Sequence, residues 1–260
     1  MEYTFHAIFV PPLWRRNGDK NMNILAIGNS FSQDATRYLH GIARAAGVHI
    51  DVANLYIGGC PLDRHFRNMH SEERCYELEY NGELTHFKVS LKEALLNRAW
   101  DAITLQQSSP KSFTYDTYVP YLNELADYIR KLCPSAKLVI HETWAYEKDS
   151  ERLFKVAKLE NPEQMINGII EANERASKEI NAFGIIRSGE LIYALTNENI
   201  GLLHRDTFHL SKGLGRYAAG LLWFAFFTGK DVTENTFSDL DEPISDEAFE
   251  TAKKLIKDYV

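Results

Sequence analysis

Residues 23–32 read Asn-Ile-Leu-Ala-Ile-Gly-Asn-Ser-Phe-Ser, and the rest of the predicted fold is arranged around them. Its apolar residues 24–27 end at Gly28, and a helical pattern begins a few residues later. A short continuous apolar run is typical of a strand buried on both faces, as in a parallel sheet. Gly28 permits a sharp turn at the carboxyl end of the strand, the edge where α/β sheets bind ligands. Ser30 is therefore expected to meet a ligand there, although Ser32 or Asp34 could simply cap the next helix.

The composition is that of an ordinary globular protein, with 45% hydrophobic and 25% charged residues among 260. A net charge of −7 argues against a nucleic-acid partner or an anionic membrane surface. No apolar run reaches the ~18 residues that span a bilayer. The three cysteines are too scattered for a disulfide framework or a zinc site, and the His and Glu residues of 61–87 lack compact ligand spacing. We therefore expect neither a metal site nor a membrane association.

The first residues differ from the rest of the chain. Residues 1–21 hold a short apolar run followed by basic residues, the reverse of the order in a secretory signal. We interpret them as an extension outside the core, with Met22 as the natural start, followed by a single domain over 22–260. Without a recognisable signal, the cytoplasm is the expected compartment.

Predicted strands alternate with predicted helices along the rest of the chain. Strands are expected at 23–28, 49–57, 101–105, 137–140 and 184–186, and helices at 33–46, 89–99, 122–132, 161–180, 214–227 and 246–259. This alternation predicts an α/β fold, a flavodoxin-like three-layer α/β/α sandwich with a central five-stranded parallel sheet in the order 2-1-3-4-5. Residues 61–87 read as a polar surface insertion, in which Asn81-Gly82 favours a hairpin turn.

A second polar segment suggests nucleophilic chemistry. A serine hydroxyl becomes a useful nucleophile when a nearby histidine, oriented by a third group, accepts its proton. Asp206 and His209 lie three positions apart before a predicted helix, so one turn could present both side chains at one point. His209 could equally be an ordinary packed or surface histidine.

Acyl transfer also needs hydrogen-bond donors for the developing oxyanion. The turns that follow three predicted strands offer the N–H groups of Ser30 and Gly59 and a side-chain amide from Gln106 or Gln107. Cys60, which follows the glycine pair 58–59, is either a small packing residue or a reactive thiol.

Four short blocks resemble those of the SGNH/GDSL hydrolase superfamily. They are Ile-Gly-Asn-Ser-Phe-Ser at 27–32, Ile-Gly-Gly-Cys at 57–60, Leu-Gln-Gln-Ser at 105–108 and Asp-Thr-Phe-His at 206–209. The chain is similar, more narrowly, to a bacterial branch catalogued as a domain of unknown function. The resemblance extends over roughly residues 22–228.

The resemblance implies that Ser30 is the nucleophile, that Gly59 is the oxyanion-hole glycine and that Asp206 and His209 complete the triad. The third block departs from the family, which usually has Asn in a Gly-x-Asn setting. We assign its amide role to Gln107, although an alignment could place Ser108 there.

The implied activity is hydrolysis of small esters, commonly acetyl groups on carbohydrate, without a metal or a cofactor. Trp144, with Tyr146 and Tyr115, could form a wall on which a sugar stacks, or all three could be ordinary partly buried aromatics. One alternative is a lipase or thioesterase of the same superfamily. The other is an inactive carbohydrate-binding relative, an alternative that is supported by the glutamine in place of the usual asparagine in the third block. A nucleotide-binding protein is disfavoured because neither Gly-x-Gly-x-x-Gly nor a P-loop follows the first strand.

Overall fold

The computed structural model describes residues 21–260. The predicted extension over residues 1–21 therefore lies, except for its last residue, outside the described residues. Met22, the proposed start, is the first residue of strand β1.

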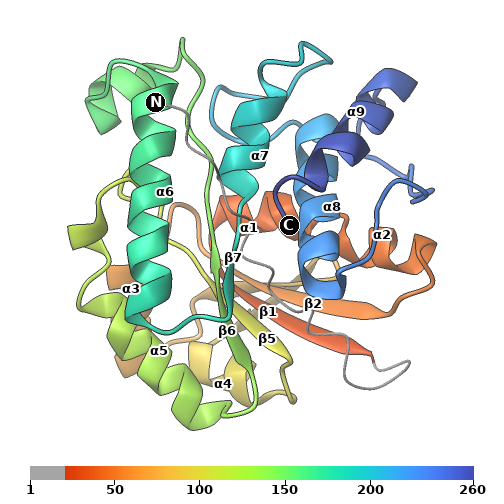
Figure 1. The fold of residues 1–260 in the computed structure, drawn as a ribbon. Helices are drawn as coiled ribbons and strands as arrows, with labels where there is room; N and C mark the ends of the chain where they lie inside the picture. The colour runs from red at the N-terminus through yellow and green to blue at the C-terminus, as the bar shows by residue number, and fades with distance from the viewer. Residues whose placement is uncertain (1–20) are drawn as a thin grey trace.

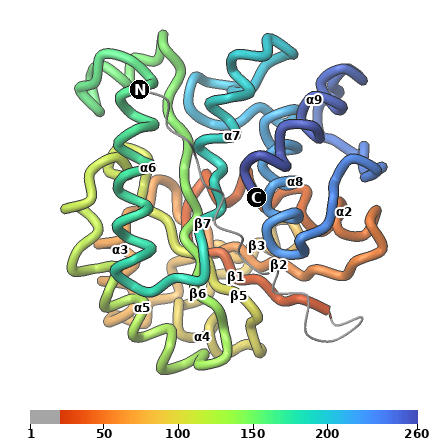
Figure 2. The backbone as a smooth tube through the Cα atoms, in the orientation of Figure 1, coloured from red at the N-terminus to blue at the C-terminus, as the bar shows by residue number. Residues whose placement is uncertain are grey.

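A seven-stranded sheet crosses the molecule in the order β4-β3-β2-β1-β5-β6-β7 (Figures 1 and 2). Its strands are β1 (Met22–Gly28), β2 (Ile50–Tyr56), β3 (Tyr76–Tyr80), β4 (Glu83–Val89), β5 (Ala102–Leu105), β6 (Lys137–His141) and β7 (Gly184–Ile186). The five strands β2-β1-β5-β6-β7 are parallel. They have the predicted flavodoxin-like order, and the predicted fold class is confirmed.

Strand β1 occupies the middle of the sheet because both of its faces are apolar. Ile24, Leu25, Ala26 and Ile27 are all fully buried. Ile24 and Ala26 pack in the core on one face of the sheet, and Leu25 and Ile27 pack in the core on the other. The alternation of a strand thus distributes one continuous apolar run between two cores.

Helices cover both faces of the sheet, as Figure 1 shows. One core packs against α1 (Ser30–Thr36), α2 (Leu39–Ala45), α7 (Ser188–Leu195), α8 (Leu214–Thr228) and α9 (Asp246–Ile256). The other packs against α3 (Leu62–Ser71), α4 (Leu91–Leu96) and α5 (Tyr121–Leu132). The long helix α6 (Pro162–Glu179) contributes to both cores, and two short helical segments, η2 (Tyr115–Thr117) and η3 (Leu153–Ala157), lie in loops.

The sheet has seven strands and not the predicted five, because the segment predicted as a surface insertion (61–87) contributes strand β3 and most of strand β4 to the sheet. The predicted hairpin forms, with positive φ at Asn81 and Gly82, and joins β3 to β4. Strand β3 then pairs antiparallel with β2 and extends the parallel sheet by two strands. The first half of this segment, expected to be irregular, forms helix α3.

The predicted helix 33–46 is two helices. The apolar stripe continues from α1 into α2, but the backbone breaks at Arg37 and Tyr38. Tyr38 bonds through its hydroxyl group to the carbonyl of Lys212 and the N–H of Asp241, which ties the break to the C-terminal part of the chain.

No helix within residues 21–260 is long and apolar enough to cross a bilayer. The most apolar one, α8, spans only Leu214–Thr228, and almost all of its side chains are buried in the core.

Glu142, immediately after β6, provides a test of pH-dependent stability. Its side chain is fully buried, and one carboxyl oxygen accepts a hydrogen bond from the N–H of Glu190 at 3.0 Å. Burial, reinforced by repulsion from Glu190, raises the pKa of Glu142 to about 8. The folded state therefore keeps a proton that the unfolded chain releases near pH 4.5, so the stability due to this group is present below pH 4.5 and lost as the pH rises towards 8.

The Glu142→Gln variant cannot ionise, so it should escape that loss. We expect its melting temperature to exceed that of the wild type by at least about 3 °C at pH 9, which is roughly 1 kcal/mol for a chain of this size, and by less at pH 5. Thermal unfolding across this range measures the difference. The exposed Glu151→Gln serves as control, and a gap that stays constant with pH contradicts the prediction.

Candidate active site

Ser30 is the first residue of α1, directly after the turn that ends β1. Asn29 caps this helix, because its side-chain oxygen accepts a hydrogen bond from the N–H of Phe31 at 3.0 Å. The N-cap residue is therefore Asn29 and not Ser32 or Asp34, while the Ser32 hydroxyl group completes the capping box by accepting the Asn29 N–H at 3.1 Å. Gly28 is needed for space, since a Cβ there would lie 2.4 Å from the Ser32 hydroxyl oxygen.

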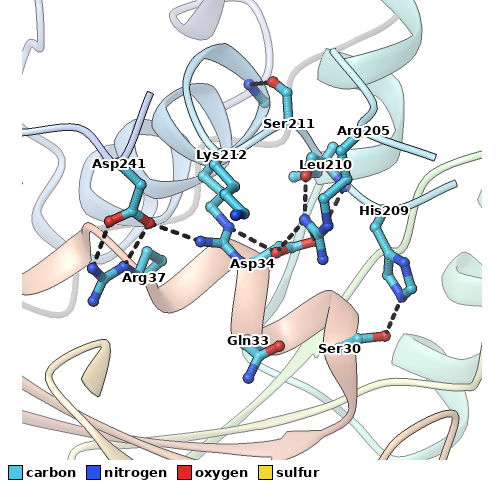
Figure 3. A network of polar contacts seen from close by, with 12 residues as sticks. Ser30, Gln33, Asp34, Arg37, Arg205, His209, Leu210, Ser211, Lys212 and Asp241 are labelled. Atoms are coloured by element: carbon cyan, nitrogen blue, oxygen red, sulfur yellow. Dashed lines mark hydrogen bonds and ion pairs between the residues drawn. The ribbon is translucent and has the colours of Figure 1, made fainter. Parts of the chain in front are cut away.

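Asp206 and His209 lie in the loop between α7 and α8 and reach Ser30 from the far end of the chain. The Asp206 Oδ2 atom is 2.7 Å from Nδ1 of His209. On the other side of the ring, Nε2 of His209 is 2.9 Å from Oγ of Ser30, the contact drawn in Figure 3. The other Asp206 oxygen accepts a hydrogen bond from the His209 N–H at 2.8 Å. The structure thus joins three predicted residues in one hydrogen-bonded row.

The electrostatics of this row favour an ionised aspartate. Burial opposes the charge of Asp206, but the hydrogen bonds from the side chain and backbone of His209 outweigh it and lower the pKa of Asp206 below its ordinary value. An ionised carboxylate at Nδ1 keeps the proton on that nitrogen and leaves Nε2 free to accept one from Ser30.

The segment 144–150 supports the loop that carries Asp206 and His209. The Glu147 N–H donates to the carbonyl of Thr207 at 2.9 Å, and the hydroxyl groups of Thr207 and Ser150 are 2.9 Å apart. Thr207 has a φ of +68°, a conformation that is unfavourable for a β-branched residue. These two contacts hold Thr207 in its positive-φ conformation, and Thr207 lies between Asp206 and His209 in the chain.

Trp144 belongs to the same support, and its predicted role in substrate binding is wrong. Its side chain is fully buried, its ring stacks on Phe31 at a centroid distance of 4.2 Å, and its N–H donates to the carbonyl of Phe208. Tyr146 is also buried, with its hydroxyl group 2.9 Å from that of Ser109, and Tyr115 lies under the guanidinium of Arg175. The proposed wall of stacking aromatics is therefore absent from these three positions.

Gly59 lies in the turn after β2, next to the nucleophile turn. It is exposed and has a φ of +62°, which suits glycine and would strain any other residue. The Asn29 side chain donates to the carbonyl of Cys60 at 3.1 Å and so ties the two turns together. The structure describes no acceptor for the N–H of Ser30 or of Gly59 among residues 21–260.

Gln107 does not serve as the expected oxyanion donor, because both ends of its amide have other partners. Its oxygen accepts hydrogen bonds from the N–H groups of Leu62 and Ser108, and its nitrogen donates to the carbonyl of Thr117 at 2.9 Å. It therefore positions the first turn of α3. Ser108, the alternative, is buried and contacts Gln107 through its backbone.

Gln106 holds the nucleophile turn from the next strand. Its nitrogen donates to the Asn29 side chain at 2.9 Å, and its oxygen is 2.8 Å from Nδ1 of His141. Burial lowers the pKa of His141 to about 3, so the ring is neutral and donates from this nitrogen. No role was predicted for Asn29, although its place between Gly28 and Ser30 was the available signal.

Cys60 is a packing residue. It is buried, and burial raises the pKa of its thiol to about 12, far from the range of a reactive thiolate. Cys60, Cys75 and Cys133 are all free thiols. Over the described part of the chain, no group of three His, Cys, Asp or Glu side chains could hold a metal ion.

Comparisons with known proteins place this chain in a family. Residues 23–258 match the family described as "Domain of unknown function (DUF4886)". The crystal structure of a DUF4886 family protein from Bacteroides uniformis is 35% identical, with a TM-score of 0.86, over 92% of this chain and 94% of that chain. No curated protein matches the chain significantly.

More distant structures share the fold. A candidate SGNH hydrolase from Slackia heliotrinireducens is 23% identical, with a TM-score of 0.58, over 80% of this chain and 99% of that chain. A member of the lipolytic protein G-D-S-L family from Veillonella parvula is 12% identical, with a TM-score of 0.50, over 79% and 98%. The chain has an SGNH-like α/β/α fold and belongs to the DUF4886 family.

Proposed function

We propose that this protein is a serine esterase that hydrolyses small acyl esters, foremost acetyl esters of carbohydrate. The observation that carries the proposal is the row Asp206–His209–Ser30, with hydrogen-bonding contacts of 2.7 and 2.9 Å. It matches a nucleophile, a base and a group that orients the base. The resemblance of the four sequence blocks to SGNH hydrolases supports the same chemistry.

In the proposed reaction, Ser30 Oγ attacks the ester carbonyl carbon while His209 Nε2 accepts the hydroxyl proton. Asp206 stabilises the imidazolium that forms. His209 then gives the proton to the departing alcohol oxygen, which leaves an acyl group on Ser30. A water molecule, deprotonated by His209, attacks this acyl group. His209 then returns the proton to Ser30 Oγ as the acyl–oxygen bond breaks, which releases the acid and regenerates the free hydroxyl group of Ser30.

The tetrahedral oxyanion would be held by the backbone N–H groups of Ser30 and Gly59. The link from Asn29 to Cys60 supports this assignment because it fixes one donor turn against the other. Preorganised donors stabilise charge that develops in the transition state, and removing one typically costs about 3 kcal/mol. The hole proposed here differs from the expected one because Gln107 is not part of it.

The length of the acyl chain tests the substrate class. We expect hydrolysis of p-nitrophenyl acetate and release of acetate from acetylated oligosaccharides, with a kcat/KM at least about tenfold higher for the acetate ester than for the octanoate. Rates are measured for a series of p-nitrophenyl esters beside enzymatic assay of free acetate. A preference for octanoate would support the lipase or thioesterase alternative, and binding of oligosaccharide without hydrolysis would support the inactive relative.

A further inference from the structure

Asp34 is a buried carboxylate that lies one helical turn after Ser30 on α1. Its side chain has no solvent exposure. The two oxygens accept hydrogen bonds from the Arg205 guanidinium at 2.9 and 3.0 Å, from Nε of Arg216 at 2.8 Å and from the N–H of Leu210 at 3.1 Å. Figure 3 shows this carboxylate between α1 and the loop before α8. The triad chemistry proposed above does not use it.

Two partners of Asp34 flank the proposed catalytic pair. Arg205 precedes Asp206, and Leu210 follows His209. The same segment is closed by a bridge between His204 and Leu210 and by a hydrogen bond from the Arg205 N–H to the His209 carbonyl at 2.9 Å. A single carboxylate therefore binds both sides of the loop whose tip carries Asp206 and His209.

Asp34 joins helix α1 to the loop before α8. In the proposed reaction, a proton moves between the same two elements, from Ser30 to His209. Helix α1 carries Ser30 and Asp34, and the loop carries His209 and Arg205. A helix is stiff over one turn, so a link at Asp34 restrains the separation between Ser30 Oγ and His209 Nε2. A misplacement of about 1 Å between reacting groups can cost on the order of 100-fold in rate.

We propose that Asp34 is a positioning residue that sets the contact between His209 and Ser30. The role rests on the proposed serine chemistry, and Asp34 acts through Arg205 and Leu210 without touching the substrate. It is distinct from the role of Asp206, which binds the imidazole itself.

The network provides a matched control in Asp241. This carboxylate binds Nη1 of Arg216 at 2.8 Å and both Nε and Nη2 of Arg37. It thus shares one arginine with Asp34 and ties α8 to the end of α1. Within the described residues it has no hydrogen bond or ion pair with the 204–210 segment. Asp241→Asn therefore perturbs the same network without releasing the loop that carries His209.

The experiment compares kcat of Asp34→Asn, Asp241→Asn and the wild type, with the concentration of reactive sites determined by fluorophosphonate titration of a separate portion of each protein. In that reaction Ser30 Oγ bonds to phosphorus, fluoride leaves and His209 takes the serine proton, so the label counts reactive sites. We expect kcat for p-nitrophenyl acetate, per titrated site, to fall about 100-fold in Asp34→Asn with KM within threefold. Asp241→Asn should stay within threefold of the wild type in both constants.

A purely structural role would give a different result. Misfolding lowers the number of titrated sites but leaves kcat per site unchanged, and equal values for Asp34→Asn and Asp241→Asn would overturn the proposal. Should Asp34→Asn fail to fold, Arg205→Gln makes the same test, because Arg205 is partly exposed and Asp34 keeps Arg216. For Arg205→Gln we expect a loss of about tenfold in kcat per site, and no loss would overturn the role.

Proton NMR separates this proposal from the esterase assignment. The Nδ1 proton of a histidine bound to a carboxylate resonates at low field, and we expect its signal from His209 to broaden or disappear in Asp34→Asn and to persist in Asp241→Asn. A wild-type protein that reacts with neither ester nor fluorophosphonate would overturn the esterase proposal, while this spectrum still decides whether Asp34 positions His209. An unchanged signal in Asp34→Asn would overturn the positioning role.

Discussion

The substitution Ser30→Ala is expected to lower kcat for p-nitrophenyl acetate by about 10⁶-fold, the size of the loss when the serine of a catalytic triad is removed. The substitution removes only the oxygen that lies 2.9 Å from His209 Nε2. The cap of α1 comes from Asn29 and not from Ser30, so the helix should form as before. Initial rates with p-nitrophenyl acetate measure the loss of activity. Circular dichroism and thermal unfolding measure separately whether the fold is retained.

The control for this experiment is Ser177→Ala, which makes the same chemical change on α6, away from the row of Ser30, His209 and Asp206. We expect its activity to match the wild type. Hydrolysis by purified Ser30→Ala at more than about one-hundredth of the wild-type rate would show that Ser30 is not the nucleophile.

The substitution Asp206→Asn is expected to lower kcat by about 10⁴-fold, because it removes the preference for the reactive tautomer of His209. The oxygen of the new amide can still accept the His209 N–H, a bond of 2.8 Å in the wild type, so the loop keeps its shape. An amide NH₂ placed at Nδ1 favours the tautomer with its proton on Nε2, which cannot accept the Ser30 proton. Steady-state kinetics gives the size of the loss.

Asp149→Asn is the matched control for this substitution. Asp149 is exposed in the segment 144–150, so its replacement changes the charge by the same amount near the site without touching His209. Its kcat should stay within threefold of the wild type. A loss of less than tenfold in Asp206→Asn would mean that another group orients His209.

The central part of the fold was predictable because its signals are local. The apolar run 24–27 and the turn glycine identify β1, and Asn161 with Pro162 marks the start of α6, where the Asn161 side chain accepts the Gln164 N–H at 2.9 Å. The alternation of strands and helices then limits the topology to few choices. The order of the parallel strands could therefore be predicted from the sequence. The strand order in turn predicts which residues meet at the carboxyl edge of the sheet.

The features that the prediction missed depend on contacts between distant segments. Helix α3 was not expected because its buried residues include His65 and Asn68, which read as polar surface in the sequence. The break between α1 and α2 depends on Tyr38 and partners about two hundred residues away, which the apolar periodicity does not show.

The errors at the candidate site have the same origin. Gln107 was assigned by its place in a block, but the acceptors and donors that occupy its amide, Thr117 and Leu62, could not be known from the sequence. Trp144 lies near a strand end, as expected, yet it faces Phe31 and the core.

The contact between Ser30 and His209 joins residues that are 179 positions apart. A growing or truncated chain that ends before residue 209 would hold the serine but not its base, and N-terminal regions fold first during synthesis. Ester hydrolysis would therefore begin only when the last third of the chain has docked on the first. The reaction would serve as a direct readout of completed folding, and proteolytic fragments that retain β1 and α1 alone would be chemically silent.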